Sequence, residues 1–187
     1  MLRIFRLSLL CAALLLSAGS AQASDKIIAP SIAVIDVQRI LEESLSAKSV
    51  QKQLEIRRAK FQTEIEVEEN GLRQAEQELS KQRSKLAAAV YADREQQLRQ
   101  RFLTVERHVQ SRRKVLDQAF TDSMNTVRTA LLDIASTMAR DRGVNLVLVK
   151  QQTLWVDKPL DITDDLLKRL NAKLPEVAIK IAPEEKP

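Results

Sequence analysis

The sequence is poor in the residues that make turns, disulfides and catalytic sites. Its 187 residues include three glycines, five prolines, one cysteine and one histidine, and only 3% are aromatic. So few turn-forming residues argue against a compact enzyme, which needs many chain reversals. The composition also excludes disulfide frameworks, collagen-like chains and Gly/Ser-rich chains. Long helices fit it better than a globular core does.

The sequence offers little catalytic or cofactor chemistry. His108 has no second histidine to act with, so we interpret it as a solvated helix residue rather than a base or metal ligand. The glycines are too few to form a phosphate-binding loop. The acidic cluster Glu64, Glu66, Glu68 and Glu69 is typical of a solvated helix face. We therefore predict a non-enzyme with no cofactor, no metal and no ATP-driven cycle.

The first 23 residues have the pattern of a secretory signal peptide. Arg3 and Arg6 precede the apolar run Leu7–Leu16, and Ala21-Gln22-Ala23 has the small-x-small form of a cleavage site. The apolar run is too short to span a bilayer comfortably. We expect cleavage after Ala23 and export to a bacterial periplasm.

The middle of the chain predicts two long helices. No proline lies between Ser31 and Lys158, and proline is the strongest helix breaker. Apolar residues recur there at intervals of seven, or of three and four, which defines a narrow apolar seam. The seam comprises Ile65, Leu72, Leu79 and Leu86, and then Leu98, Phe102, Val105, Val109, Leu116, Phe120, Met124, Val127, Leu131, Ile134 and Met138. A narrow seam packs against one partner helix, so residues 47–142 should form a helical-hairpin arm.

Three positions define the expected shape of this arm. The two helices should be nearly equal in length, and Asp93 followed by Gln96 has the form of a capping box, so we place the hairpin tip near Ala88–Asp93. Gly71 then lies inside the first helix as a pliable point. Gly143 follows the last turn of the second helix and predicts its end.

The two ends predict a small body made of residues 24–46 and 143–174. Three short strands are expected, at Ser31–Asp36, Val144–Val149 and Thr153–Val156. Asp161–Lys173 is expected to be a short helix, because acidic residues occupy its first turn and basic residues its later turns. The predicted fold is therefore mainly α, with a long antiparallel coiled-coil arm projecting from a small β-stranded body.

A body of this size is at the margin of independent stability. We therefore expect oligomerisation to complete its core. The residues expected to pack there are Ile32, Val34, Leu146, Leu148 and Trp155. The tail 175–187 is expected to be mobile, with the alternation of Val177, Ile179 and Ile181 as a hint of a short added strand.

Positive charge is concentrated in one part of the arm, since residues 71–114 carry a net charge of +6. One interpretation is a surface that attracts acidic polypeptides, lipid headgroups or lipopolysaccharide. The other is a charged face that keeps a long hairpin soluble. The candidate contact residues for a client or an anionic lipid are Arg94, Arg99, Arg101, Arg112, Arg113 and Lys114. Nucleic acid suits the charge, but an exported protein does not ordinarily meet it, so no nucleic-acid partner is expected.

Segments at both ends of the mature chain carry a family pattern. They are Ile32–Leu41, and Gly143–Val149 followed by Asp161–Asp164 and the leucines Leu166, Leu167 and Leu170. On these residues the chain resembles the Skp/OmpH family of periplasmic chaperones. The resemblance implies a homotrimer whose helical arms enclose a cavity, and ATP-independent holding of unfolded outer-membrane proteins before their insertion. It also implies a lipopolysaccharide site of basic arm residues, and Arg112, Arg113 and Lys114 lie in the comparable region.

A second hypothesis is a periplasmic coiled-coil adaptor, a structural spacer of an envelope assembly. An adaptor binds one folded partner, whereas a holding chaperone binds many unfolded ones. Arms with few contacts bend and admit clients of different size, which suits the chaperone hypothesis.

Overall fold

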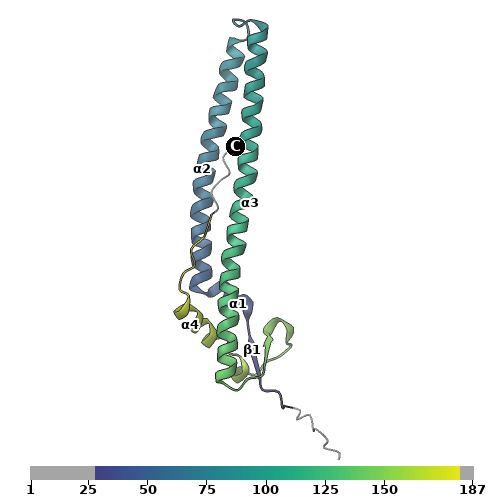
Figure 1. Ribbon diagram of the computed structural model, residues 1–187, viewed down its shortest axis with the longest axis vertical. Helices are drawn as coiled ribbons and strands as arrows, with labels where there is room; N and C mark the ends of the chain where they lie inside the picture. Colours follow the sequence, from purple (N-terminus) through teal and green to yellow (C-terminus); the bar gives the residue numbers. More distant parts are fainter. Residues whose placement is uncertain (1–27, 182–187) are drawn as a thin grey trace, which may run out of the picture.

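A long helical hairpin stands on a small body in which both ends of the hairpin meet (Figure 1). The computed structural model describes residues 28–181, so the predicted signal peptide lies outside the described part of the chain. The elements in order are β1 (Ile32–Ile35), α1 (Val37–Glu43), α2 (Leu45–Gln82), α3 (Ala88–Asp141), β2 (Leu146–Val149), η1 (Lys150–Gln152), η2 (Lys158–Leu160) and α4 (Thr163–Lys173). The predicted fold class, mainly helical with a small sheet and a long hairpin, is confirmed.

The arm consists of α2 and α3, which are 38 and 54 residues long. At the start of α2, the hydroxyl of Ser44 accepts a hydrogen bond from the backbone N–H of Ala47 at 3.3 Å, which caps the helix. At the end of α3, Gly143 has a φ of +65°. This left-handed conformation costs glycine little and is the common way to end a helix. The predicted end of the second helix is thus confirmed.

The tip of the hairpin comprises residues 83–87, and the predicted tip at Ala88–Asp93 is wrong. α2 ends at Gln82 and α3 already begins at Ala88. Asp93 lies inside α3, where its carboxylate accepts a hydrogen bond from the side chain of Gln97 at 2.8 Å instead of capping the helix. The alanines at 88 and 89 are strong helix formers, so the helix starts before the candidate capping box.

The body contains a two-stranded parallel sheet, in which Ile32 pairs with Leu146 and Ile35 with Val149. Parallel strands need a long crossover connection, and here the whole arm is that connection. The strand predicted at Thr153–Val156 is not formed. Asp161 makes the bridge to Val34 instead, and the N–H of Ile162 donates to the carbonyl of Val34 at 3.0 Å. Asp161 and Ile162 therefore occupy the edge of β1 where the predicted third strand could have paired.

One apolar core joins the body to the base of the arm. Its fully buried side chains come from all four α-helices: Ile40 from α1, Val50 from α2, Leu131 and Met138 from α3, and Leu166 and Leu170 from α4. The sequence did not predict α1 as a separate helix. It begins because the carboxylate of Asp36 accepts a hydrogen bond from the N–H of Arg39 at 3.0 Å, and it brings Ile40 into the core.

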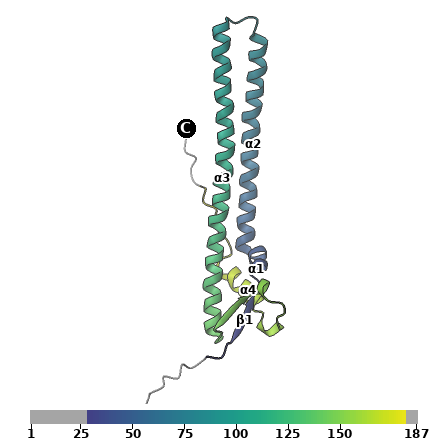
Figure 2. The same cartoon turned by 90° about the vertical axis from the view of Figure 1, so that its right-hand side faces the viewer.

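After α4 the chain runs along the arm toward its tip, as both views show (Figures 1 and 2). Residues 174–181 form no regular strand, unlike the alternative suggested by their alternation. Nor do they extend freely from the body, as the expectation of a mobile tail implied. Val177 is 8% exposed and belongs to the apolar core.

Candidate functional site

The packing between α2 and α3 weakens from the base of the arm to its tip. At the base, Val50, Leu54 and Val127 are at most 4% exposed. Farther out, Leu72 and Leu79 are the only buried residues of α2, and Arg112 is the only buried residue of α3 on the tip side of Leu116. The outer arm therefore presents a partly open apolar seam, which includes Phe102 at 42% exposure.

Arg112 lies between the two helices and does not form part of the exposed basic surface, although the sequence placed it there. Its side chain is only 10% exposed, and its guanidinium lies 3.4 Å from Glu64 and 3.8 Å from Glu68. The same guanidinium stands 5.2 Å from the centre of the Phe61 ring, within range of a cation–π contact. Arg112 thus links α2 to α3 by charge where apolar packing is thin.

Two further sequence interpretations need correction at this cluster. His108 is not simply solvated, because its Nδ1 is buried and lies 3.7 Å from a carboxylate oxygen of Glu68. Glu64 and Glu68 face α3, whereas Glu66 and Glu69 are exposed. Two members of the acidic cluster therefore face the other helix of the hairpin, and the other two face solvent.

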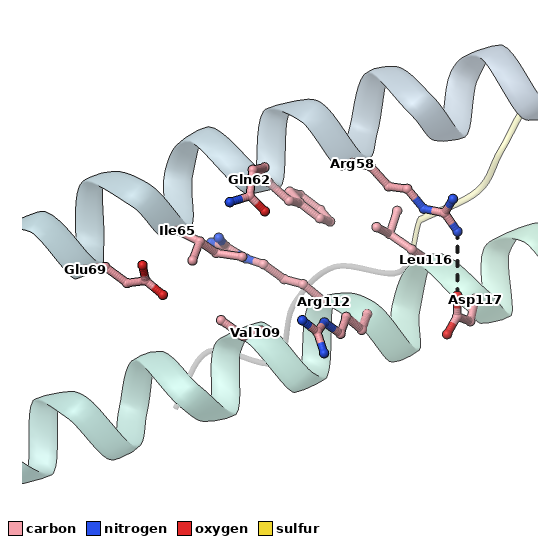
Figure 3. Close-up of a pocket in the computed structure, with 10 residues that line it drawn as sticks. Arg58, Gln62, Ile65, Glu69, Val109, Arg112, Leu116 and Asp117 are labelled. Atoms are coloured by element: carbon pink, nitrogen blue, oxygen red, sulfur yellow. Dashed lines mark ion pairs between the residues drawn. The ribbon is translucent and has the colours of Figure 1, made fainter.

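A recess of about 510 Å³ opens beside this cluster (Figure 3). Apolar groups come from both helices, among them Phe61, Ile65 and Val109. One end of the recess carries an ion pair between Arg58 and Asp117, whose charged atoms are 3.9 Å apart. A mixed apolar and charged surface of this kind suits weak contacts with an extended polypeptide better than it suits a small rigid ligand.

The other five candidate basic residues are exposed along α3. Near the tip, Arg94 donates to the side-chain oxygen of Gln82 at 2.7 Å, and Arg99 pairs with Glu95 at 2.7 Å. Arg101 borders a small recess that also includes Leu79 and Leu98. From Arg94 to Lys114 the helix advances by about 30 Å, so these residues form a dispersed basic face and not one compact anion site.

The body exposes apolar side chains around the loop between β2 and α4. Leu154 and Trp155 are 105% and 79% exposed, and Leu146 and Leu160 are 42% and 41% exposed. Large apolar side chains that are exposed to this extent, as Leu154 and Trp155 are, favour an interaction surface. Of the residues predicted to pack in an oligomeric body, Val34 is buried within the chain, Ile32 and Leu148 are partly buried, and Leu146 and Trp155 are exposed.

A polar cluster around Asp161 holds this loop to the sheet and to α4. Burial alone would raise the pKa of Asp161, but hydrogen bonds from Lys150 and from the hydroxyl and N–H of Thr163 outweigh it and lower the pKa to about 2. The ammonium of Lys150 donates at 2.9 Å. The Thr163 hydroxyl also accepts a hydrogen bond from the N–H of Asp36 at 2.9 Å. Sequence reasoning missed this cluster, since its members come from three segments that are separate in the sequence.

Within residues 28–181, the acidic and histidine side chains form no group of three that is placed to hold a metal ion. None of the helices in this part of the chain is long and apolar enough to cross a bilayer.

Comparison with known proteins gives a consistent result. The family described as outer membrane protein (OmpH-like) matches residues 31–170. The chaperone protein Skp of Pectobacterium atrosepticum is 29% identical over 173 residues, and that of Yersinia enterocolitica is 27% identical over 161 residues. Each alignment covers 86% of this chain and 97% of the relative.

A crystal structure described as an OmpH-like outer membrane chaperone, from Caulobacter crescentus CB15, has a TM-score of 0.78 with this chain at 16% identity. The match covers 84% of this chain and 94% of the other, so the two share a fold. Skp proteins are non-enzymatic chaperones, which confirms the prediction of a non-enzyme. The family match extends from the start of β1 into α4, and the chain therefore belongs to the OmpH-like family, to which the Skp chaperones also belong.

Proposed function

We propose that this protein is an ATP-independent periplasmic holding chaperone, which binds unfolded outer-membrane β-barrel proteins between helical arms and keeps them soluble for membrane insertion. The observation that carries the proposal is the OmpH-like family match over residues 31–170. The outer arm supports it, because a partly open seam with polar edges offers many weak contacts. Weak, distributed contacts hold an unfolded chain without imposing a fold on it.

The working form in this proposal is a homotrimer joined through the body. Its support is the exposed apolar surface of Leu154 and Trp155, which a neighbouring copy would cover, together with the small size of the body. Sedimentation of the mature protein should give a trimer at micromolar concentration. A stable folded monomer under those conditions would contradict this arrangement.

The central experiment measures holding activity. An unfolded outer-membrane β-barrel protein is diluted from denaturant into buffer with or without the purified mature protein, in the absence of ATP, and light scattering follows its aggregation. Suppression of scattering when about one trimer is present for each client molecule supports the proposal. No suppression, combined with tight binding to one folded envelope protein, would favour the coiled-coil adaptor instead.

The dispersed basic face is proposed to accelerate capture of acidic clients or contact with anionic membrane surfaces. Exposed charges act at long range, and the Debye length at physiological salt is about 8 Å. Replacing Arg94, Arg99, Arg101, Arg113 and Lys114 by Gln should therefore slow capture at low salt and matter less at high salt. Equal capture rates for the wild type and the Gln variant at low salt would mean that the basic face serves only to keep the hairpin soluble. Adding lipopolysaccharide as a competitor tests the anionic site implied by the family.

Export is tested separately. N-terminal sequencing of the protein recovered from a periplasmic fraction should begin at Ser24, if cleavage follows Ala23 as the sequence predicts.

A further inference from the structure

The segment after α4 follows the base of the arm as an extended strap, defined here as residues 175–181. Val177 is 8% exposed and lies in the same buried cluster as Val50 and Val127, while Ile179 packs against that cluster. Ala178 and Lys180 are exposed. Alternate side chains of the strap therefore point into the arm and out to solvent, as in a β-strand that covers a core.

One side chain of α2 holds the strap by its backbone. The amide nitrogen of Gln53 donates to the carbonyl oxygen of Val177 at 2.9 Å, and the amide oxygen of Gln53 accepts from the N–H of Ile179 at 3.2 Å. The same nitrogen donates to the hydroxyl of Ser49 at 2.9 Å, which fixes the orientation of the amide. Both polar atoms of the Gln53 amide thus face the strap with a defined donor and acceptor.

This geometry reproduces the pairing of two parallel strands. In a parallel ladder, a single residue accepts from the N–H and donates to the carbonyl of the two residues that flank its partner. Gln53 makes this pair of bonds to the residues that flank Ala178, so its side-chain amide supplies the donor and the acceptor that one residue of a neighbouring strand would supply. Only an extended segment presents a carbonyl and an N–H two residues apart on one side. The two hydrogen bonds of Gln53 therefore recognise the backbone of the bound segment and not the identity of its side chains.

The side-chain requirements of the site are equally general. Two apolar side chains at alternate positions fill the core-facing places, and the residues between them reach solvent. Strands of outer-membrane barrels have this alternation of apolar and polar residues. A strap that is held by backbone bonds and by alternate apolar side chains is therefore a chemical mimic of one such strand.

We propose that Gln53 and the apolar surface beside it form a docking site for one extended strand of an unfolded polypeptide with alternating apolar side chains. The strap occupies this site within the chain until a client strand displaces it. The client's identity rests on the function proposed above, whereas the site itself is defined by contacts within this chain. The strap thereby sets a threshold, because a client segment must compete with a covalently attached occupant.

The test uses the full mature chain and a fluorescent synthetic peptide with the sequence of residues 174–181. The variant V177D/I179D is designed to release the strap, and A178D/K180Q makes the same change of net charge at the exposed positions as a matched control. In the wild type the peptide must displace a strap that buries Val177 and part of Ile179 on this surface, whereas in the released variant the surface is free. The released variant should therefore bind the peptide at least about tenfold more tightly than the wild type does, and the control variant should match the wild type.

Gln53→Ala added to the released variant should weaken peptide binding about fivefold, since it removes the two hydrogen bonds to the backbone of the bound segment. Gln51→Ala, at an exposed position on the same helix, should leave binding unchanged. Equal peptide binding by all variants, or by none, would overturn the docking site. A released variant that loses its helical circular dichroism without recovery on adding peptide would also overturn it, because the strap would then be an indispensable part of the core.

A second measurement separates this proposal from the holding function. In the scattering assay, the released variant should capture the unfolded barrel protein faster than the wild type, and Gln53→Ala should reverse the gain. Peptide binding with no effect on client capture would leave the docking site but refute its use by clients. Peptide binding by a protein that suppresses no aggregation at all would refute the proposed holding function and leave the docking site intact.

Discussion

The base of the arm and the outer arm use the same two helices but differ in how much they bury. At the base, α1 and α4 add their side chains to the core, and Val127 and Leu131 are at most 1% exposed. On the tip side of Leu116, neither α1 nor α4 contributes to the packing among residues 28–181, and the only side chain that α3 buries is that of Arg112. Two helices alone cannot enclose a wide apolar face, so the outer arm retains surface for weak contacts while the base anchors the fold.

The largest expected loss of unfolding free energy comes from removing a buried side chain at the base of the arm. Leu131→Ala removes a side chain that is 1% exposed, and truncation of a buried leucine costs about 3 kcal/mol. Leu132→Ala is the matched control, because Leu132 is 65% exposed, and its change should stay within about 0.5 kcal/mol. Urea unfolding of both variants measures the difference. Similar losses in the two variants would contradict the assignment of the anchor to the base.

Removing the carboxylate of the polar cluster around Asp161 should cause the next largest loss of stability, and this loss should depend on pH. The pKa of Asp161 in the folded chain is about 2, below its ordinary value of 3.8. A carboxylate with a lowered folded pKa adds stability above its unfolded pKa and loses it as the pH falls through the folded pKa. Asp161→Asn should therefore cost roughly 2 kcal/mol at pH 7, and the difference from wild type should shrink between about pH 4 and pH 2.

Asp157 provides the control for this measurement. It lies in the same loop, is exposed and forms no ion pair with the residues that the structure describes. Asp157→Asn should leave the unfolding free energy unchanged within about 0.5 kcal/mol at every pH. A parallel pH dependence in the two variants would show that Asp161 has no special part in the body.

In the outer arm, Arg112→Met should cost roughly 1–2 kcal/mol. The guanidinium is nearly buried, but Glu64 and Glu68 retain 40% and 33% side-chain exposure, so water can resolvate both carboxylates after the change. Arg113→Met is the control, because Arg113 is exposed. Hydrogen exchange should quicken near Val109 in the Arg112 variant and stay unchanged near Leu131. Uniform quickening along α3 would show that the arm unfolds as one unit.

The smallest expected effect is a gain of stability in the outer arm, whereas the substitutions above should reduce stability. Gly71 lies inside the continuous helix α2, and a methyl group added there meets nothing within 4 Å. Gly71→Ala should therefore stabilise the helix locally by up to about 1 kcal/mol. The variant should slow hydrogen exchange around residue 71 and narrow the range of client sizes held. Exchange in the wild type as slow near residue 71 as near Leu131 would contradict the idea of a pliable point.

Several features followed from the sequence because they depend on local order along the chain. The absence of proline and the seam spacing determined that residues 45–82 and 88–141 are helical, and a helix needs only neighbours three and four residues away. Gly143 determined where α3 ends for the same local reason. Strands at 32–35 and 146–149 were predicted within two residues, since short β-rich runs flanked by turn residues have few alternatives.

The placement of Arg112 was within reach of the sequence and was missed. Arg112 lies three residues after Val109 and four before Leu116, and Glu68 lies three after Ile65 and four before Leu72. Both charges therefore occupy seam positions, on opposite helices, with opposite signs. A seam that alternates apolar and charged members predicts an interhelical ion pair as well as an apolar contact.

Other features were decided only by the tertiary structure. Thr153–Val156 has strand-like composition, but Asp161 and Ile162 already occupy the edge of β1, and this competition arises only once α4 is docked. The strap likewise depends on Gln53, more than 120 residues away in the chain. Local propensity cannot show which backbone groups find partners over such separations, because that choice depends on which surfaces the folded arm and body leave open.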